Sequence, residues 1–218
     1  MQIESRVMDL LISRLCHDLI SPAGAIVNGI ELVEEFGGDD MAGDDLGGDD
    51  MTGEAMALVG RSARQLSARL SLFRVAFGSS GERDGFPAVD CRRLLDAYLH
   101  EGKVRLDWSL DRLPSGPGAA RLVLLLAIIA AESLPRGGVL RIDAGEGGHA
   151  AFRILAEGTD ARIEAGTETA MAAGMADSAA PEDLDARAAP AYLAGLIAAR
   201  RGDGLRMLRQ PGAVSFTA

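Results

Sequence analysis

The sequence has few aromatic residues, few cysteines and a shortage of positive charge. Only 4% of its 218 residues are aromatic, so Ala, Leu, Val and Ile have to fill the core. The 32 acidic residues outnumber the 22 basic ones and give a formal net charge of −10. Because nucleic acids attract basic surfaces, this balance argues against a nucleic-acid partner. The two cysteines, Cys16 and Cys91, lie too far apart to match the spacing of a metal site.

Long apolar runs are lacking as well. The longest, residues 122–131, has about half of the length that a membrane-spanning helix needs. Residues 1–6 lead directly into a mixed amphipathic run, without the pattern of a signal peptide. With 48% hydrophobic and 25% charged residues, the composition is typical of a globular protein. We therefore expect a cytoplasmic protein with no membrane partner.

The first third of the sequence has the spacing of two packed helices. Apolar or small residues recur at alternating intervals of four and three, which is a heptad seam. The first helix has its seam at Met8, Ile12, Leu15, Leu19, Pro22, Ile26, Gly29, Val33 and Phe36, and the second at Met56, Val59, Ala63, Leu66, Leu70, Phe73 and Phe77. Between them, residues 37–52 are rich in Gly and paired Asp, which predicts a solvated loop in an antiparallel hairpin.

A single pair of helices buries too little surface to be stable alone. The first helix also carries apolar residues outside the seam, at Leu11, Ile20, Val27 and Ile30. A second copy of the hairpin would cover them, so we predict a homodimer that forms a four-helix bundle across a twofold axis.

The second half, which begins near residue 85, alternates between helical and strand patterns. We predict helices over 90–99, 118–134 and 184–201, and strands over 103–110, 139–144, 150–156, 205–208 and 213–216. Asp90 is expected to cap its helix, and Trp108 to lie in the core. The predicted fold class is α+β, with a helical hairpin over residues 1–80 and an α/β sandwich over residues 85–218. Its helices should cover one face of a mostly antiparallel sheet.

His17 carries the clearest functional signal. On the first helix it lies roughly 160° from Leu15 and Leu19, so it faces away from the seam. An isolated surface histidine would lie the same way, and the sequence around it is what makes it a candidate. Pro22 removes the backbone hydrogen bond to the carbonyl of Asp18, which opens the helix within one turn of His17. We expect Cys16, beside it, to be a buried or half-buried small side chain.

The run from His17 to Pro22 resembles the H-box of sensor histidine kinases. Residues 14–35 resemble more closely the ChpT family of histidine phosphotransferases of alphaproteobacterial cell-cycle signalling, and a weaker resemblance extends through the second half. The resemblance implies a phosphorelay protein that accepts a phosphoryl group on His17 from the receiver aspartate of a hybrid kinase. It would pass that group to the receivers of response regulators. The second half would resemble the ATP-binding (Bergerat) domain of the kinases.

The residues around His17 fit such chemistry. Neutral imidazole is a good nucleophile and forms a labile phosphoramidate. Asp18 could orient the ring or accept its proton, or be a solvated acid. Arg14 is the only positive residue near His17 that the sequence indicates, so the charge that a moving phosphoryl group needs should come from the partner, including its magnesium ion. The candidate partner-binding residues are Arg14, Ile20, Ser21, Gly24, Asn28, Arg64, Ser67 and Ser71.

The residues that bind ATP in the kinases have no counterparts here. The resemblance aligns Ala127 and Ala131 with two asparagines of the kinase helix, and Ala156 with the aspartate that recognises adenine. The counterpart of the glycine-rich loop, residues 185–192, contains no glycine. We therefore predict that this chain holds no ATP, metal or other cofactor. A shift of one residue, which would offer Glu157 or Asp160, stays open.

Two other functions also stay open. The chain could dock receiver domains without accepting phosphate. It could also be an ATP-dependent sensor histidine kinase, which the missing residues make less favourable.

Overall fold

The computed structural model describes residues 4–36, 47–145 and 151–218. Contacts between residues divide the chain into two compact units. One comprises Leu15–Leu70, and the other comprises Met1–Arg14 together with Ser71–Ala218. The Asp pairs at 39–40 and 44–45 of the predicted loop lie outside the described residues.

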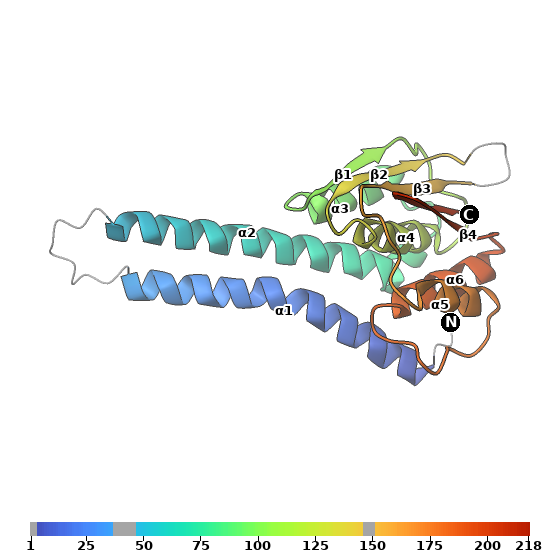
Figure 1. Ribbon diagram of the computed structural model, residues 1–218, viewed down its shortest axis with the longest axis horizontal. Helices are drawn as coiled ribbons and strands as arrows, with labels where there is room; N and C mark the ends of the chain where they lie inside the picture. Colours follow the sequence, from blue (N-terminus) through green and yellow to red (C-terminus); the bar gives the residue numbers. More distant parts are fainter. Residues whose placement is uncertain (1–3, 37–46, 146–150) are drawn as a thin grey trace. The chain divides into compact units, whose positions relative to one another are not determined.

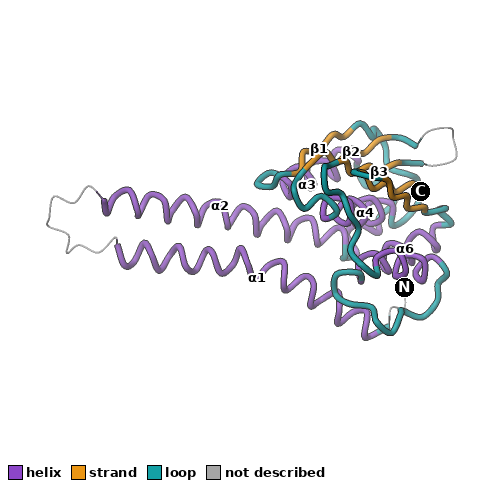
Figure 2. Tube along the Cα trace, viewed as in Figure 1, coloured by secondary structure: helices purple, strands orange, loops and turns teal. Residues whose placement is uncertain are grey.

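Two long helices, α1 (Ser5–Phe36) and α2 (Gly47–Ala76), form the predicted hairpin (Figures 1 and 2). The prediction of a loop as far as residue 52 was wrong, because α2 already begins at Gly47. Acidic residues are favoured in the first turn of a helix by the helix dipole, so an Asp-rich stretch does not by itself exclude a helix start.

The seam within Leu15–Leu70 follows the prediction on α1 and only in part on α2. On α1, Pro22 and Gly29 are buried and Leu15, Leu19, Ile26 and Val33 are half-buried. On α2, the predicted positions Val59 and Leu66 are half-buried, whereas Met56, Ala63 and Leu70 are exposed and the preceding residues Ala55, Ser62 and Arg69 are buried or half-buried. The two helices approach closely at Gly29, where a Cβ would lie 2.6 Å from Cγ2 of Val59, a predicted seam residue, and 3.3 Å from the Ala55 carbonyl oxygen.

The first turns of α1 belong to the other unit and bury different residues than predicted. Val7 and Leu11 are buried, while Met8 and Ile12 are about half exposed. Arg6 Nη1 donates to the carbonyl of Pro181 at 2.9 Å. These turns therefore lie against the segment near residue 181, to which Glu4 and Arg6 are hydrogen-bonded.

The sheet has five strands in the order β1-β2-β3-β5-β4. Its strands are β1 (Val104–Trp108), β2 (Gly138–Asp143), β3 (Arg153–Glu157), β4 (Arg206–Gln210) and β5 (Ala213–Thr217). β1 pairs with β2 in parallel, and the other neighbours are antiparallel, as predicted. Alternate residues such as Leu140, Ile154 and Phe216 are fully buried, so one face of the sheet forms the core.

Helix α4 (Ala119–Glu132) contacts three strands of this sheet and is buried from residue 119 to residue 131. Around it lie α3 (Ala88–Leu99), α6 (Ala189–Arg201) and the short 3-10 helix η1 (Ser79–Glu82) (Figure 1). The predicted cap at Asp90 was wrong, because α3 follows Pro87 and Asp90 lies in its first turn. Trp108 is half-buried, and its Nε1 donates to the Leu110 carbonyl at 2.8 Å.

Helix α5 (Thr167–Met175) was not predicted. It packs closely on α6, since a Cβ at Gly195 would lie 2.3 Å from the Met171 carbonyl oxygen. The predicted helix over 184–201 is shorter and begins at Ala189. Glycines at the contact let the backbones of α5 and α6 come close together. Two helices rich in small residues can therefore pack even where the apolar periodicity is weak.

By length and composition alone, α1 could cross a membrane. The prediction from the sequence considered only unbroken apolar runs. The mean hydropathy of α1 is high enough for a membrane span although polar residues are interspersed among its apolar ones. It is one helix near the N-terminus, and among the described residues no second helix meets the same criterion. Helices of soluble cores and signal sequences meet it too, so the finding is weak evidence for a membrane span.

Candidate functional site

His17 lies in the middle of α1 with its ring in solvent. Its side chain is 85% exposed, in agreement with its angular distance from the seam. Cys16, expected to be at least half-buried, is exposed instead. The sequence therefore presents an accessible imidazole on a regular helix.

Asp18 contacts the histidine ring although adjacent helical residues diverge by about 100°. Its Oδ1 lies 3.2 Å from His17 Nδ1, and its own side chain is only 16% exposed. A carboxylate is an acceptor, so it favours the neutral tautomer with the proton on Nδ1. That tautomer leaves the lone pair of Nε2 free, on the ring nitrogen that points away from Asp18.

Arg69 of α2 reaches the backbone beside His17. Pro22 has no N–H for the carbonyl of Asp18, and Arg69 Nη1 donates to that carbonyl instead. The sequence-based statement that Arg14 is the only positive residue near His17 was therefore wrong. Arg69 sits 51 positions away in the chain, and only the pairing of the two helices reveals it.

Arg14 forms an ion pair with Glu132 at the end of α4. Its side chain is 16% exposed, and that of Glu132 is 33% exposed. The guanidinium is therefore already engaged with a carboxylate of its own chain.

The other predicted partner-binding residues are mostly accessible. Ile20 is 68% exposed. Ser21, Gly24, Asn28, Arg64 and Ser67 are exposed as well, and Ser71 is half-buried. A Cβ built at Gly24 would meet none of the described atoms within 4 Å, so the helix surface is open there.

The two helices are in register over this region. Arg69 contacts Asp18. Val59, ten positions earlier on α2, lies against Gly29, eleven positions later on α1. Because antiparallel helices advance in opposite directions, these contacts bring residues 64–67 of α2 to the level of residues 20–23 of α1.

The counterparts of the kinase ATP residues are buried and aliphatic. Ala127 and Ala156 are fully buried, and Ala131 is 8% exposed. In the counterpart of the glycine-rich loop, Asp185 Oδ1 accepts from the backbone N–H groups of Arg187 at 2.9 Å and Ala188 at 2.8 Å. This loop is therefore a capped turn that leads into α6, and not an open glycine loop.

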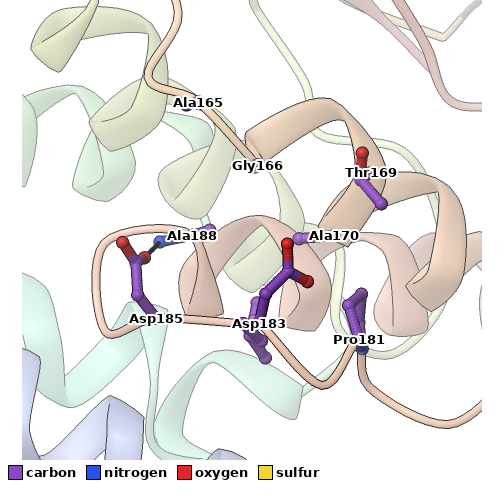
Figure 3. Close-up of a pocket in the computed structure, with 9 residues that line it drawn as sticks. Ala165, Gly166, Thr169, Ala170, Pro181, Asp183, Asp185 and Ala188 are labelled. Atoms are coloured by element: carbon purple, nitrogen blue, oxygen red, sulfur yellow. Dashed lines mark hydrogen bonds between the residues drawn. The ribbon is translucent and has the colours of Figure 1, made fainter.

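A small cavity of about 190 Å³ lies beside this turn (Figure 3). Its lining includes Gly166, Thr169, Pro181 and two carboxylates, Asp183 and Asp185, and none of the described lining residues is basic. Across residues 4–36, 47–145 and 151–218 there is no group of three or more His, Cys, Asp or Glu residues that could hold a metal ion. A phosphate-bearing ligand would meet negative charge in this cavity.

The tyrosine and leucines that follow the turn belong to the core. Tyr192, Leu193 and Leu196 are at most 4% exposed. The Tyr192 hydroxyl donates to the Ser178 carbonyl at 2.8 Å, and burial is the main cause that raises its pKa. These side chains offer no surface to a partner.

Comparisons with known proteins match both parts of the chain. The family model described as histidine phosphotransferase C-terminal domain matches residues 89–211. A protein phosphotransferase ChpT from Brucella abortus (strain 2308) is 37% identical over 134 residues. That match covers 61% of this chain and 58% of the relative, so it spans little more than half of the relative's length.

A solved structure described as a bacterial phosphotransferase matches with a TM-score of 0.75 and 30% identity. The match covers 100% of this chain and 97% of that one, so it includes the hairpin as well as the α/β part. The family model alone covers more than half of the chain. The chain belongs to the histidine phosphotransferase family and is ChpT-like.

Proposed function

We propose that this chain is a phosphorelay protein of two-component signalling that accepts a phosphoryl group on His17 Nε2 from the receiver aspartate of a hybrid kinase. It passes the group to the receivers of response regulators and does not use ATP. The observation that carries the proposal is the exposed imidazole whose Nδ1 lies 3.2 Å from the Asp18 carboxylate.

In the accepting step, the lone pair of Nε2 attacks the phosphorus of the receiver's aspartyl phosphate. The bond from phosphorus to the aspartyl oxygen breaks, and its electron pair stays on the receiver's carboxylate. The positive charge that develops on the imidazole is stabilised by Asp18, which can take the Nδ1 proton. The reverse sequence delivers the group to the next receiver, whose own magnesium ion and lysine neutralise the phosphoryl oxygens.

The surface that meets the receiver is proposed to surround His17. Ile20, Ser21, Gly24 and Asn28 lie on or beside the histidine face of α1, and Arg64, Ser67 and Ser71 extend it onto α2. Small side chains at Ser21 and Gly24 let a receiver approach the ring closely. Arg14, which is paired with Glu132, would take part only by exchanging that partner.

We propose that the hairpin dimerises and that residues 1–80 act as the dimerisation and phosphotransfer domain. Val27 and Ile30 are 54% and 44% exposed. On α1 they lie between the histidine face and the seam, so a second hairpin could cover them without covering His17. The resulting arrangement would be a four-helix bundle.

The proposed α/β domain, residues 85–218, resembles a kinase ATP-binding domain that has lost its ligand. Buried Ala127 and Ala131 cannot bind magnesium, and the turn capped by Asp185 cannot wrap phosphates. The acidic cavity beside that turn supports the same conclusion, because it disfavours anions. We place the relay in the cytoplasm and, from the ChpT resemblance, in cell-cycle signalling.

The test follows radiolabelled phosphate from phosphorylated receiver domains onto the protein without ATP. We expect label on the wild type that resists alkali and is lost in acid, and none on His17→Ala. Gly24→Arg should bind and accept poorly while remaining a dimer, because the long side chain fills the open surface beside the ring.

Three outcomes would contradict the proposal. Binding of cognate receivers without any label would indicate a docking module. Label on His17→Ala would place the acceptor elsewhere. Labelling of His17 by ATP alone would make the chain a kinase.

A further inference from the structure

Pro22 lies inside helix α1 and removes one backbone hydrogen bond of that helix. Pro22 cannot donate to the Asp18 carbonyl four residues earlier, and Asp18 is half-buried between the two helices. A charged donor from outside the helix can replace the lost bond and stabilise this turn. Arg69 Nη1 of α2 is that donor.

The position of Arg69 on α2 supports the importance of this contact. Arg69 follows Ala55, Val59, Ser62 and Leu66 at helical spacing, in a seam where apolar residues are the rule. It is half-buried there, so part of its stem is removed from water. A hydrogen bond from a charged donor is stronger than one between neutral groups, which compensates for placing a guanidinium in the seam.

The contact acts on the residue that orients the histidine. The carbonyl that Arg69 holds and the carboxylate that approaches His17 Nδ1 belong to the same residue, Asp18. We propose that Arg69 is a positioning residue for phosphotransfer: it replaces the hydrogen bond that Pro22 removes and so fixes the turn from which Asp18 meets the imidazole. This inference rests on the proposed function of His17.

The geometry predicts that Arg69 and Pro22 act as a pair. With Pro22 present, removal of Arg69 leaves the Asp18 carbonyl to water and loosens the Asp18–His17 contact. With Pro22→Ala, residue 22 supplies an ordinary helical N–H to that carbonyl, and Arg69 becomes dispensable. A residue needed only for general packing of the seam would be needed equally in both backgrounds.

The experiment compares wild type, Arg69→Met, Pro22→Ala and the double variant, with Arg61→Met as a matched control. Arg61 is an exposed arginine two turns earlier on the same helix and has no contact with Asp18 among those described. The first readout is the nitrogen NMR spectrum of the His17 ring across pH, which reports tautomer and pKa and needs no receiver. The second is the initial rate of phosphoryl transfer from a phosphorylated receiver domain.

We expect Arg69→Met to reduce the transfer rate by on the order of tenfold, since small displacements of a reacting group are costly. The ring spectrum should show less of the tautomer with the proton on Nδ1. In the Pro22→Ala background, Arg69→Met should change the rate by less than about twofold and leave the tautomer as it is. Arg61→Met should behave as wild type. If Arg69→Met does not fold, Arg69→Lys replaces it, because a lysine keeps one charged donor and should give an intermediate rate.

Equal losses in both backgrounds, or an unchanged ring spectrum and rate in Arg69→Met, would overturn the inference. If no receiver labels His17 in the wild type, the proposed function fails. The ring spectra of the four proteins still decide the role of Arg69 in that case.

Discussion

The two regions of the molecule differ in how they use apolar residues. In the α/β unit, α4 is buried on every side from residue 119 to residue 131, with no side chain more than 8% exposed. In the hairpin, Ile20, Val27 and Ile30 of α1 remain 44–68% exposed. One region completes its core within a single chain, whereas the other displays apolar surface that water does not favour. The difference indicates that the hairpin is the part that requires a partner.

The regions also differ in how they treat polar groups. In the α/β unit, the alanines at positions 127, 131 and 156 are buried and belong to the core. The hairpin has a solvent-exposed His17, an acid in contact with its ring and a proline inside the same helix. The exposed polar groups of the proposed site therefore lie on the hairpin, whereas the aligned positions of the α/β unit are packed in its core.

The largest expected effect comes from charging the exposed apolar surface of the hairpin. Val27→Asp would remove about 1.5 kcal/mol of burial in each copy and force a carboxylate into an apolar contact, which costs several kcal/mol more. In a twofold dimer the substitution occurs once in each copy. The free energy of dimerisation should therefore become less favourable by at least about 6 kcal/mol, on the order of 10⁴-fold in dissociation constant. Sedimentation at micromolar concentration should change from dimer to monomer.

The control for this experiment is Glu35→Lys, which changes charge on the histidine face of the same helix. It should remain dimeric. A wild type that is monomeric across the concentration range, or a Val27→Asp protein that stays dimeric, would show that the exposed apolar residues serve another partner.

A smaller effect is expected from the core of the α/β unit. Leu125→Ala removes a fully buried side chain of α4 and should lower the free energy of unfolding by about 2–5 kcal/mol. Val89→Ala, at a position that is 68% exposed on α3, should change it by less than about 0.5 kcal/mol. Denaturant titration followed by the fluorescence of Trp108, the single tryptophan, reports on this unit.

The same titration sharpens the comparison between the regions. Val27→Asp should leave the transition of Trp108 nearly unchanged, because the two compact units have separate cores. A coincident shift would mean that the stability of the α/β unit depends on hairpin dimerisation.

Sequence patterns predicted the parts of the fold that depend on strong periodicity. The hairpin, α4 and the five strands were found because apolar residues recur with a period of 3.6 or 2 over their length. The mostly antiparallel sheet was also predicted. The start of α2 at Gly47 and the helix α5 were missed, because Gly, Asp, Ala and Thr give no apolar stripe to detect.

Within the candidate site, the sequence identified His17, Asp18 and Pro22 because they lie within six positions of one another. Arg69 was missed because its role depends on the register of α2. The prediction placed the seam on Leu70, one residue away, and an arginine at that level was not expected to face inward. The backbone hydrogen bond that Pro22 removes was the available signal, since a lost backbone bond implies a donor nearby.

The last prediction concerns the thiol of Cys91 on α3. Cys91 is buried in the α/β unit, whereas Cys16 on the hairpin is exposed. Burial, together with the charge of Asp90, raises the pKa of Cys91 from 9.0 to about 12. The folded thiol stays neutral above pH 9 while the unfolded thiol ionises, so its contribution to stability is fully present below pH 9 and is lost as the pH rises toward 12. Between pH 8 and pH 10 the free energy of unfolding should fall by about 1.4 kcal/mol more in wild type than in Cys91→Ala. Denaturant titrations of both proteins at the two pH values measure this difference, and equal slopes would mean that the thiol ionises in the folded state.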